Sequence, residues 1–192
     1  MYLQRPDVVA KACEILDRYG LADLTMRRLA RELGVSPGAL YWHFSDKQEL
    51  LGAVADRLLA PVPAAFGGDW PARMIALCTA LRAALLSTTD GAELVSATFA
   101  AGRSPALQDI AEALAAVAAE SGLPGAEAQL AARTVIYYVL GFTVDEQSRL
   151  QWDAAGSETP AERTTKGGSP DRFVFGLRLL VGGLAAHTAV PR

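Results

Sequence analysis

The chain has 192 residues, enough for one large core or for a small domain followed by a larger one. Hydrophobic residues make up 51% of it, yet no apolar run approaches the roughly 20 residues that span a membrane. The formal net charge is −3, and residues 1–60 carry eight basic and eight acidic residues. A surface for nucleic acid would therefore have to be a local basic face on a neutral domain.

The N-terminus has no basic segment followed by an apolar core, so no signal peptide is expected. Cys13 and Cys78 are isolated within helical apolar patterns. This favours reduced core cysteines over a disulfide or a metal site. Together these features predict a cytoplasmic protein.

The first element predicted is a helix over residues 6–19. Its apolar residues recur at helical spacing and give one buried face: Val8, Val9, Ala12, Ile15, Leu16 and Tyr19. Gly20 is expected to end this helix.

Residues 25–47 predict two short helices joined by a tight turn. In the first of them, Leu29 and Leu33 lie on the apolar face, and Gly34 ends it because glycine adopts a left-handed conformation most easily. Val35 is expected to be buried in the turn. Ser36 is the expected cap of the second helix. This spacing is typical of a helix–turn–helix.

The second helix of this pair is predicted over about residues 37–44, with Leu40 and Phe44 facing inward. Its outer surface would then carry Pro37, Gly38, Ala39, Tyr41 and His43. Small residues at the front of a helix allow it to enter a major groove, and the two larger side chains can reach phosphates. An ordinary helical hairpin with an aromatic packing face is the alternative.

The remaining pattern is also helical, and nothing is predicted to form a strand. A helix from residue 45, opened by a capping box of Ser45 and Gln48, is expected to end before the prolines of a joint at residues 61–69. Further helices are predicted near residues 70–86, 92–99, 105–120, 125–152 and 170–187. Residues 153–170 are rich in Gly, Ser, Thr and Pro and predict a mobile loop. The fold class is therefore all-α.

Two of these segments, residues 135–142 and 173–184, are apolar on nearly every face. A helix of this kind must be buried on all sides. In a domain of this size that suggests a partner surface as well as a core, which we interpret as a four-helix interface of a homodimer; a monomeric core is the alternative.

The run LYWHFSDK at residues 40–47 closely resembles the end of the recognition helix in the TetR family of bacterial transcription repressors. The runs ALLSTTDGAEL, LGFTVDEQ and FVFGLRLLVGGL are similar to the regulatory domain of the tetracycline-repressor branch of that family. The resemblance implies a DNA-binding domain at residues 1–60 and a ligand-binding and dimerisation domain at residues 61–192. It also implies a homodimer that binds near-palindromic double-stranded operator DNA and releases it when a small molecule enters the second domain.

Carried over to this sequence, the resemblance implies a set of DNA-contacting residues. Arg27 would contact a base or a nearby phosphate, and Arg28 lies beside it; a solvated helix face is the alternative for both. The residues expected at base edges are Ser36, Pro37, Gly38 and Ala39. The residues expected at phosphates are Thr25, Tyr41, His43 and Lys47.

The ligand site departs from that branch of the family. Where polar groups and a metal-chelating histidine surround tetracycline, the matching positions here are Pro63, Leu77, Leu81 and Val95. The expected ligand is therefore an apolar inducer, with no metal and no cofactor. The candidate lining residues, for which core packing is the alternative, are Phe66, Trp70, Met74, Leu77, Leu81, Val95, Thr98, Phe99, Tyr137 and Asp145.

An enzyme is not expected, and no catalytic residue is assigned. The sequence has two histidines, and no Ser-His-Asp order, Cys/His cluster or Gly-rich phosphate loop is visible in it. The remaining alternative to a sequence-specific repressor is a helical ligand-binding or architectural protein.

Overall fold

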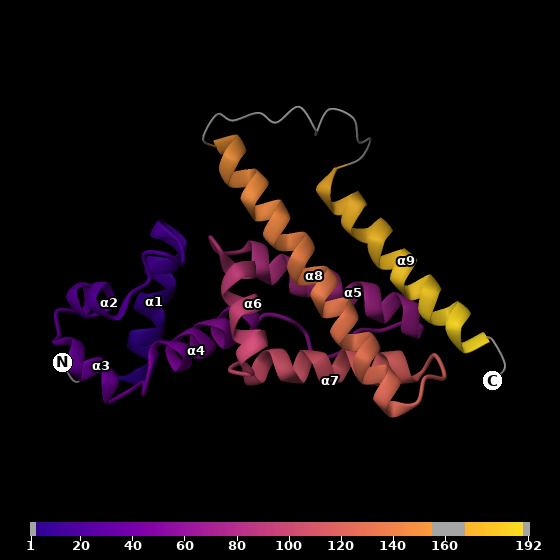
Figure 1. Ribbon diagram of the computed structural model, residues 1–192, viewed down its shortest axis with the longest axis horizontal. Helices are drawn as coiled ribbons and strands as arrows, with labels where there is room; N and C mark the ends of the chain where they lie inside the picture. The colour runs from indigo at the N-terminus through magenta and orange to yellow at the C-terminus, as the bar shows by residue number, and fades with distance from the viewer. Residues whose placement is uncertain (1–2, 155–167, 190–192) are drawn as a thin grey trace. The chain divides into compact units, whose positions relative to one another are not determined.

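The computed structural model describes residues 3–154 and 168–189, and all regular structure in these ranges is helical (Figure 1). This confirms the all-α prediction. Within the described ranges no helix is long and apolar enough to cross a membrane. In chain order the helices are α1 Arg5–Tyr19, α2 Met26–Leu33, α3 Pro37–Tyr41, α4 Lys47–Leu59, α5 Trp70–Leu86, α6 Gly91–Ala101, α7 Pro105–Ala119, α8 Gly125–Ala154 and α9 Ser169–Ala189.

The described residues form two compact units. The first comprises Met1–Pro61 together with Ala84–Gln108, and the second comprises Val62–Ala83 together with Asp109–Arg192. Helices α5 and α7 each contribute residues to both units. The functional boundary between residues 60 and 61 stays a prediction.

The first unit is built on the apolar face of α1. Five of its predicted residues are buried: Val8, Val9, Ala12, Ile15 and Leu16. Tyr19 is different, because 43% of it is exposed and its ring lies against the Arg28 guanidinium, 3.7 Å from the centroid. Gly20 ends the helix with φ +79°, as expected. The Thr89 hydroxyl donates to the Asp17 carbonyl at 2.8 Å and so ties the end of α1 to the turn before α6.

Helix α4 packs closely on the α6–α7 region of the same unit. A Cβ added at Gly52 would lie 2.1 Å from the Arg103 carbonyl oxygen, so only glycine allows this approach. One turn further on, the Asp56 carboxylate accepts hydrogen bonds from the Ser104 hydroxyl at 2.6 Å and from the Ala106 backbone N–H at 3.1 Å. Asp56 thus satisfies a donor at the start of α7 that the helix itself leaves free.

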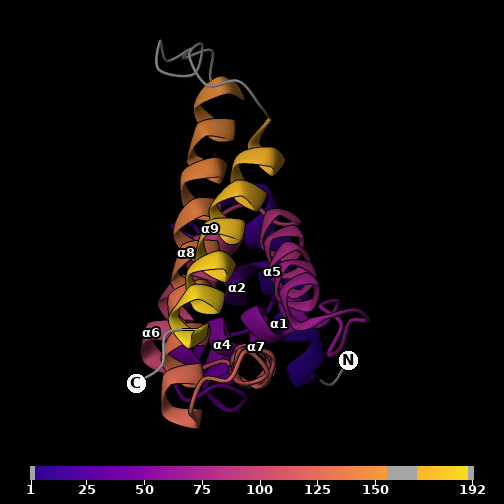
Figure 2. The same ribbon diagram turned by 90° about the vertical axis from the view of Figure 1, so that its right-hand side faces the viewer.

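The second unit joins α5, α8 and α9 through a buried ion pair. The Arg82 guanidinium on α5 binds the Glu146 carboxylate on α8 with two hydrogen bonds, and its carbon lies 5.2 Å from the centre of the Phe173 ring on α9. Helices α8 and α9 lie side by side in Figures 1 and 2. The Tyr138 hydroxyl donates to the Phe173 carbonyl at 2.9 Å, and a Cβ at Gly176 would lie 2.1 Å from that hydroxyl oxygen.

Several predicted boundaries shift by a few residues. The helix expected at residues 92–99 runs over Gly91–Ala101, the one expected to reach residue 120 ends at Ala119, and α8 continues to Ala154. The loop predicted at residues 153–170 loses its ends to α8 and α9, and its central residues 155–167 lie outside the described ranges. Cys13 is half-buried and Cys78 buried, both as free thiols, and burial raises the pKa of Cys78 to about 12.

Substituting Gly52→Ala should destabilise the first unit. The new methyl group meets a backbone carbonyl that cannot move without shifting the start of α7, and overpacking of this kind costs about 1–3 kcal/mol. The urea midpoint of unfolding measures the effect. The control is Gly67→Ala, where an added Cβ meets nothing within 4 Å. Equal midpoints for both variants would contradict the close packing.

Candidate functional site

The turn between α2 and α3 has the geometry that the sequence predicts. The Thr25 side chain caps α2 by accepting a hydrogen bond from the Arg28 N–H at 3.1 Å. Gly34 ends α2 in the left-handed conformation, with φ 67° and ψ 30°, and its N–H donates to the Arg31 carbonyl at 3.1 Å. Pro37 occupies the first turn of α3, where its missing N–H leaves no bond unmade. Val35, which the sequence predicts to be buried in the turn, is only half-buried there.

Helix α3 is shorter than predicted. It ends at Tyr41 and not at Phe44, because residues 42–44 turn the chain toward α4. Leu40 and Phe44 are nevertheless both fully buried, as predicted. Ser36 holds the capping position of α3, but its side chain makes no capping hydrogen bond.

The expected capping box at Ser45 and Gln48 is wrong. Asp46 caps α4 instead, and its carboxylate accepts the Glu49 N–H at 2.7 Å. Glu49 in turn accepts the Ser45 N–H at 2.7 Å and the Ser45 hydroxyl at 2.9 Å. The residue types of a capping box are therefore present one position later, with Asp46 and Glu49 as the pair.

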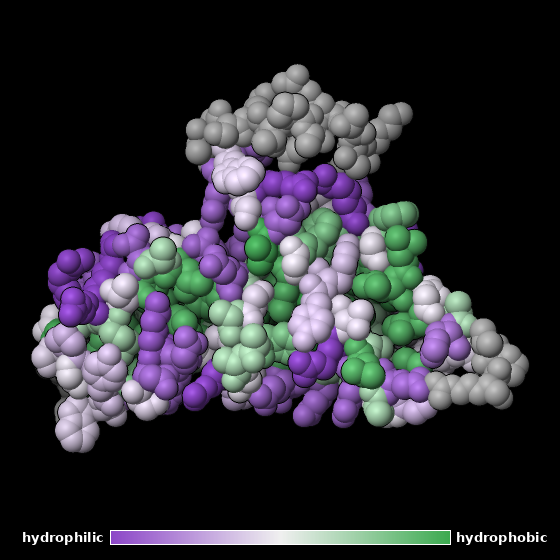
Figure 3. All heavy atoms as spheres, in the orientation of Figure 1, coloured by the Kyte–Doolittle hydropathy of each residue, from purple (hydrophilic) through white to green (hydrophobic). Residues whose placement is uncertain are grey.

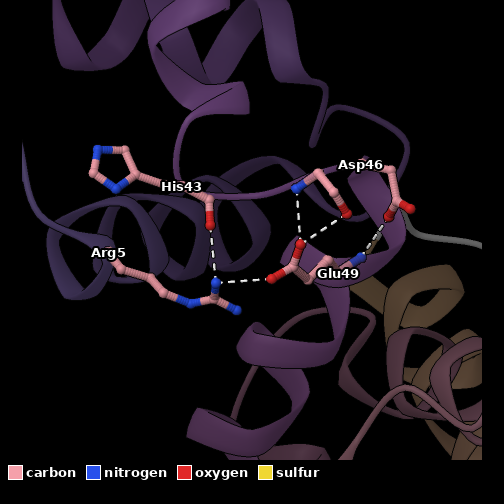
Figure 4. Close-up of polar contacts among 5 residues, drawn as sticks. Arg5, His43, Asp46 and Glu49 are labelled. Atoms are coloured by element: carbon pink, nitrogen blue, oxygen red, sulfur yellow. Dashed lines mark hydrogen bonds and ion pairs between the residues drawn. The ribbon is translucent and has the colours of Figure 1, made fainter.

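Arg5 fastens this loop to α1, as Figure 4 shows. Its guanidinium donates to the His43 carbonyl and to the Glu49 carboxylate, both at 2.8 Å, and lies 4.2 Å from the centre of the Phe44 ring. The hydrogen bond from the Ser45 backbone N–H, followed by those from the Arg5 and Ser45 side chains, lowers the pKa of Glu49 to about 2. The segment that follows α3 is thus held both by Arg5 of α1 and by Glu49 of α4.

The outer side of α3 and its turn presents the predicted residues to solvent. Thr25, Arg27, Ser36, Pro37, Gly38 and Tyr41 are exposed, while Ala39, His43 and Lys47 are half-buried. Sequence reasoning missed Trp42, which is 90% exposed beside Tyr41. Its position between two predicted contact residues was the available signal. Helical spacing did not predict the exposure of Trp42, because α3 ends at Tyr41 and Trp42 lies after it.

Arg28 differs from its neighbour Arg27. Its guanidinium pairs with the Asp23 carboxylate at 2.5 Å, it lies over the Tyr19 ring, and only 19% of its side chain is exposed. These contacts give Arg28 a packing role at the α1–α2 junction.

The candidate ligand residues divide between the two units. In the first, Val95 and Thr98 are buried and Phe99 is half-buried on α6, and the Thr98 hydroxyl donates to the Val95 carbonyl at 2.9 Å. In the second, Met74, Leu77 and Leu81 are buried on α5, and Phe66 and Trp70 are half-buried.

The polar candidates of the second unit lie on the surface of the single chain. Tyr137 is 56% exposed, and its hydroxyl accepts a hydrogen bond from Arg133 at 3.2 Å. Asp145 pairs with Arg149 at 2.6 Å and borders a cavity of about 260 Å³ near the C-terminal end of α8. A second cavity brings together Phe66 and Leu77. The described part of this unit therefore does not gather its candidates into one site.

Glu49→Gln should remove a contribution to folding stability that depends on the ionised Glu49 carboxylate. A carboxylate whose pKa is lower in the folded than in the unfolded chain stabilises the fold above its unfolded pKa, here 4.5. That contribution is lost as the pH falls toward about 2. The difference in melting temperature between wild type and variant should therefore be largest near neutral pH and shrink below about pH 4.5.

Thermal unfolding across this pH range measures the difference. Glu32→Gln, on the exposed side of α2, is the matched control. A wild-type to variant difference that stays constant down to about pH 3 would contradict the role of Glu49.

Two family models match the chain. Residues 8–54 match the bacterial regulatory proteins of the tetR family, and residues 62–164 match the tetracyclin repressor-like C-terminal domain. The tetracycline repressor protein class A from transposon 1721 of Escherichia coli is 33% identical to the chain, over 99% of the chain and 94% of that repressor.

Solved structures give the same relationship. The crystal structure of Mycobacterium smegmatis BioQ is 58% identical with a TM-score of 0.88, over 97% of this chain and 99% of that one. BioQ crystallised with its natural double-stranded DNA operator is 55% identical with a TM-score of 0.81, over 97% of this chain and 100% of that one. Proteins of this family are DNA-binding transcription factors and not enzymes. With the helix–turn–helix and both family domains in one chain, the protein belongs to the TetR family of bacterial transcriptional regulators.

Proposed function

We propose that this protein is a ligand-responsive repressor that binds a near-palindromic operator as a homodimer and releases it when an apolar small molecule binds. It would act in the cytoplasm, where bacterial chromosomal DNA lies. The observation that carries the proposal is the α2–turn–α3 unit, in which Leu40 and Phe44 are buried while Tyr41 and Trp42 face solvent.

The exposed side of α3 fits a major groove. Pro37 and Gly38 have no bulk that would keep the helix from the base edges. Apolar contacts from Pro37 and Ala39 suit thymine methyl groups, and the Ser36 hydroxyl, which makes no capping bond, can reach a base edge or a phosphate. Tyr41, Trp42 and Lys47 flank this front and would hold the backbone. BioQ, a relative of this chain, was crystallised with its natural double-stranded DNA operator, which supports operator binding by this chain.

Binding as a homodimer is supported by the apolar surface of α8 and α9. Six large hydrophobic residues on the described parts of these two helices are more than half exposed in the single chain: Leu130, Tyr137, Leu150, Trp152, Phe175 and Leu179. Figure 3 shows hydrophobic residues gathered at the surface over these helices. A two-fold axis through this face would bury it in both copies. Binding of the two operator half-sites would require two recognition helices about 34–36 Å apart, one turn of DNA.

An apolar inducer is supported by the side chains of α5. Met74, Leu77 and Leu81 are buried, and Val95 is buried on α6, where the resemblance places a chelating histidine in the tetracycline-repressor branch. A metal-bound drug buried against such residues would leave polar groups unpaired at about 1–3 kcal/mol each. Release of DNA further requires that the inducer bind the DNA-incompetent state more tightly.

Lys47→Ala should weaken binding to every duplex, because the proposed contact is with phosphate. A preferred sequence is first selected from randomised duplexes, and affinity is then measured by anisotropy at several salt concentrations. Each phosphate contact contributes about 0.9 to the slope of log affinity against log salt, so a dimer that loses two should show a slope smaller by about 1.8.

Lys11→Ala is the control, since Lys11 pairs with Glu14 on α1, outside the helix–turn–helix. An unchanged slope in Lys47→Ala would contradict the docking. A selection that recovers no preferred sequence would favour the alternative of an architectural protein.

Leu179→Glu should convert the dimer into a folded monomer. The residue is 62% exposed in the single chain, so the charge is tolerated there, whereas an interface would bury it without a partner. Sedimentation velocity at micromolar concentration measures the assembly. Ala22→Glu adds the same charge to an exposed turn of the first unit and should remain dimeric. Dimers in both variants would exclude this face as the interface.

A further inference from the structure

The second unit contains a cavity of about 180 Å³ between α5, α7 and the segment that precedes α5. Its walls are mostly apolar and include Phe66, Leu77 and Val117, together with four alanines. An engineered apolar cavity of about 150 Å³ in another protein binds benzene. A single ring or a short alkyl chain would therefore fill this space.

Two charged residues, Arg73 of α5 and Glu120 directly after α7, complete the cavity lining, and they pair with each other. They are unequally exposed, at 25% for the arginine side chain and 49% for the glutamate. The Nε of Arg73 is buried and has no hydrogen-bond partner within the described part of the chain. Arg73 therefore keeps an unused donor beside an apolar cavity.

In this ion pair, the carboxylate of a ligand can replace the Glu120 carboxylate on Arg73. Glu120 is half exposed, and an ion pair of that kind contributes little to stability, so its carboxylate can return to water at small cost. Arg73 is held more deeply, and its planar guanidinium can bind a carboxylate through two parallel N–H donors, including the unused Nε. An uncharged ligand would use neither property.

We propose that the cavity binds a small apolar carboxylic acid, with the ring or alkyl chain between α5 and α7 and the carboxylate on Arg73 in place of Glu120. This inference deepens the proposed ligand response and rests on it. The cavity wall includes Ala64–Phe66, which follow α4 closely in the chain, so a bound acid would constrain the segment connected to the DNA-binding helices.

The test compares acids with their uncharged counterparts on the full-length protein. Hexanoate, octanoate, phenylacetate and 3-phenylpropionate are titrated by calorimetry up to millimolar concentration, alongside the corresponding alcohols. At least one acid should bind saturably, and its alcohol should bind about tenfold more weakly or not at all. Binding by none of the acids, or equal binding of acid and alcohol, would overturn the proposal.

Substitutions at the two residues of the pair should change the affinity for that acid in opposite directions. Arg73→Gln should weaken its binding about tenfold or more, Arg73→Lys should restore part of it, and Glu120→Gln should strengthen it because the competing carboxylate is gone. A pair with only a structural role would instead show losses in both Arg73→Gln and Glu120→Gln. Arg18→Gln, on α1 of the other unit, is the control and should leave binding unchanged.

Anisotropy with the selected operator separates this inference from the broader proposal. Acid binding that depends on Arg73 but leaves DNA affinity unchanged would support the site and contradict its role in operator release. Operator release by another compound, together with no binding of any of the acids, would support the repressor and contradict this site.

Discussion

The proposed DNA-facing surface depends on the burial of Leu40 and Phe44. Helix α3 has five residues, far too few to be stable by its own hydrogen bonds. Both side chains are fully buried, and Arg5 lies over the Phe44 ring while it binds Glu49 at the start of α4. The position of Tyr41 and Trp42 is therefore a consequence of packing beneath them and not of helix propensity.

The same logic explains why only some charged residues are available for DNA. Arg5 and Arg28 both lie near the helix–turn–helix, yet each is held by a carboxylate and an aromatic ring of the same unit. Arg27 remains exposed. Fewer arginines are therefore available to contact DNA than the sequence of this region contains. A basic face of this limited size on a neutral domain favours moderate and salt-sensitive DNA binding.

In the second unit, two arginines of α5 form ion pairs that differ in burial and therefore in their contribution to the fold. Arg82 and Glu146 are each about nine-tenths buried and make two hydrogen bonds, so loss of either partner would leave a buried charge. This pair holds α5 to α8 and, through Phe173, to α9. Arg73 and Glu120 are more exposed and border a cavity, so their pairing can change without loss of the fold. Burial thus separates a structural pair from one suited to recognition.

The sequence by itself determined what depends on near neighbours in the chain: the all-α class, the bounds of α5, the left-handed Gly34 and the inward direction of Leu40 and Phe44. These follow from helical spacing and from the conformational freedom of single residues. Only the tertiary structure decided where α3 ends, that Asp46 and not Ser45 caps α4, and that Arg28 packs against Tyr19. It alone placed Arg73 beside Glu120, 47 positions away. Such contacts depend on how distant segments fold onto each other, and neither spacing nor propensity along the chain encodes that.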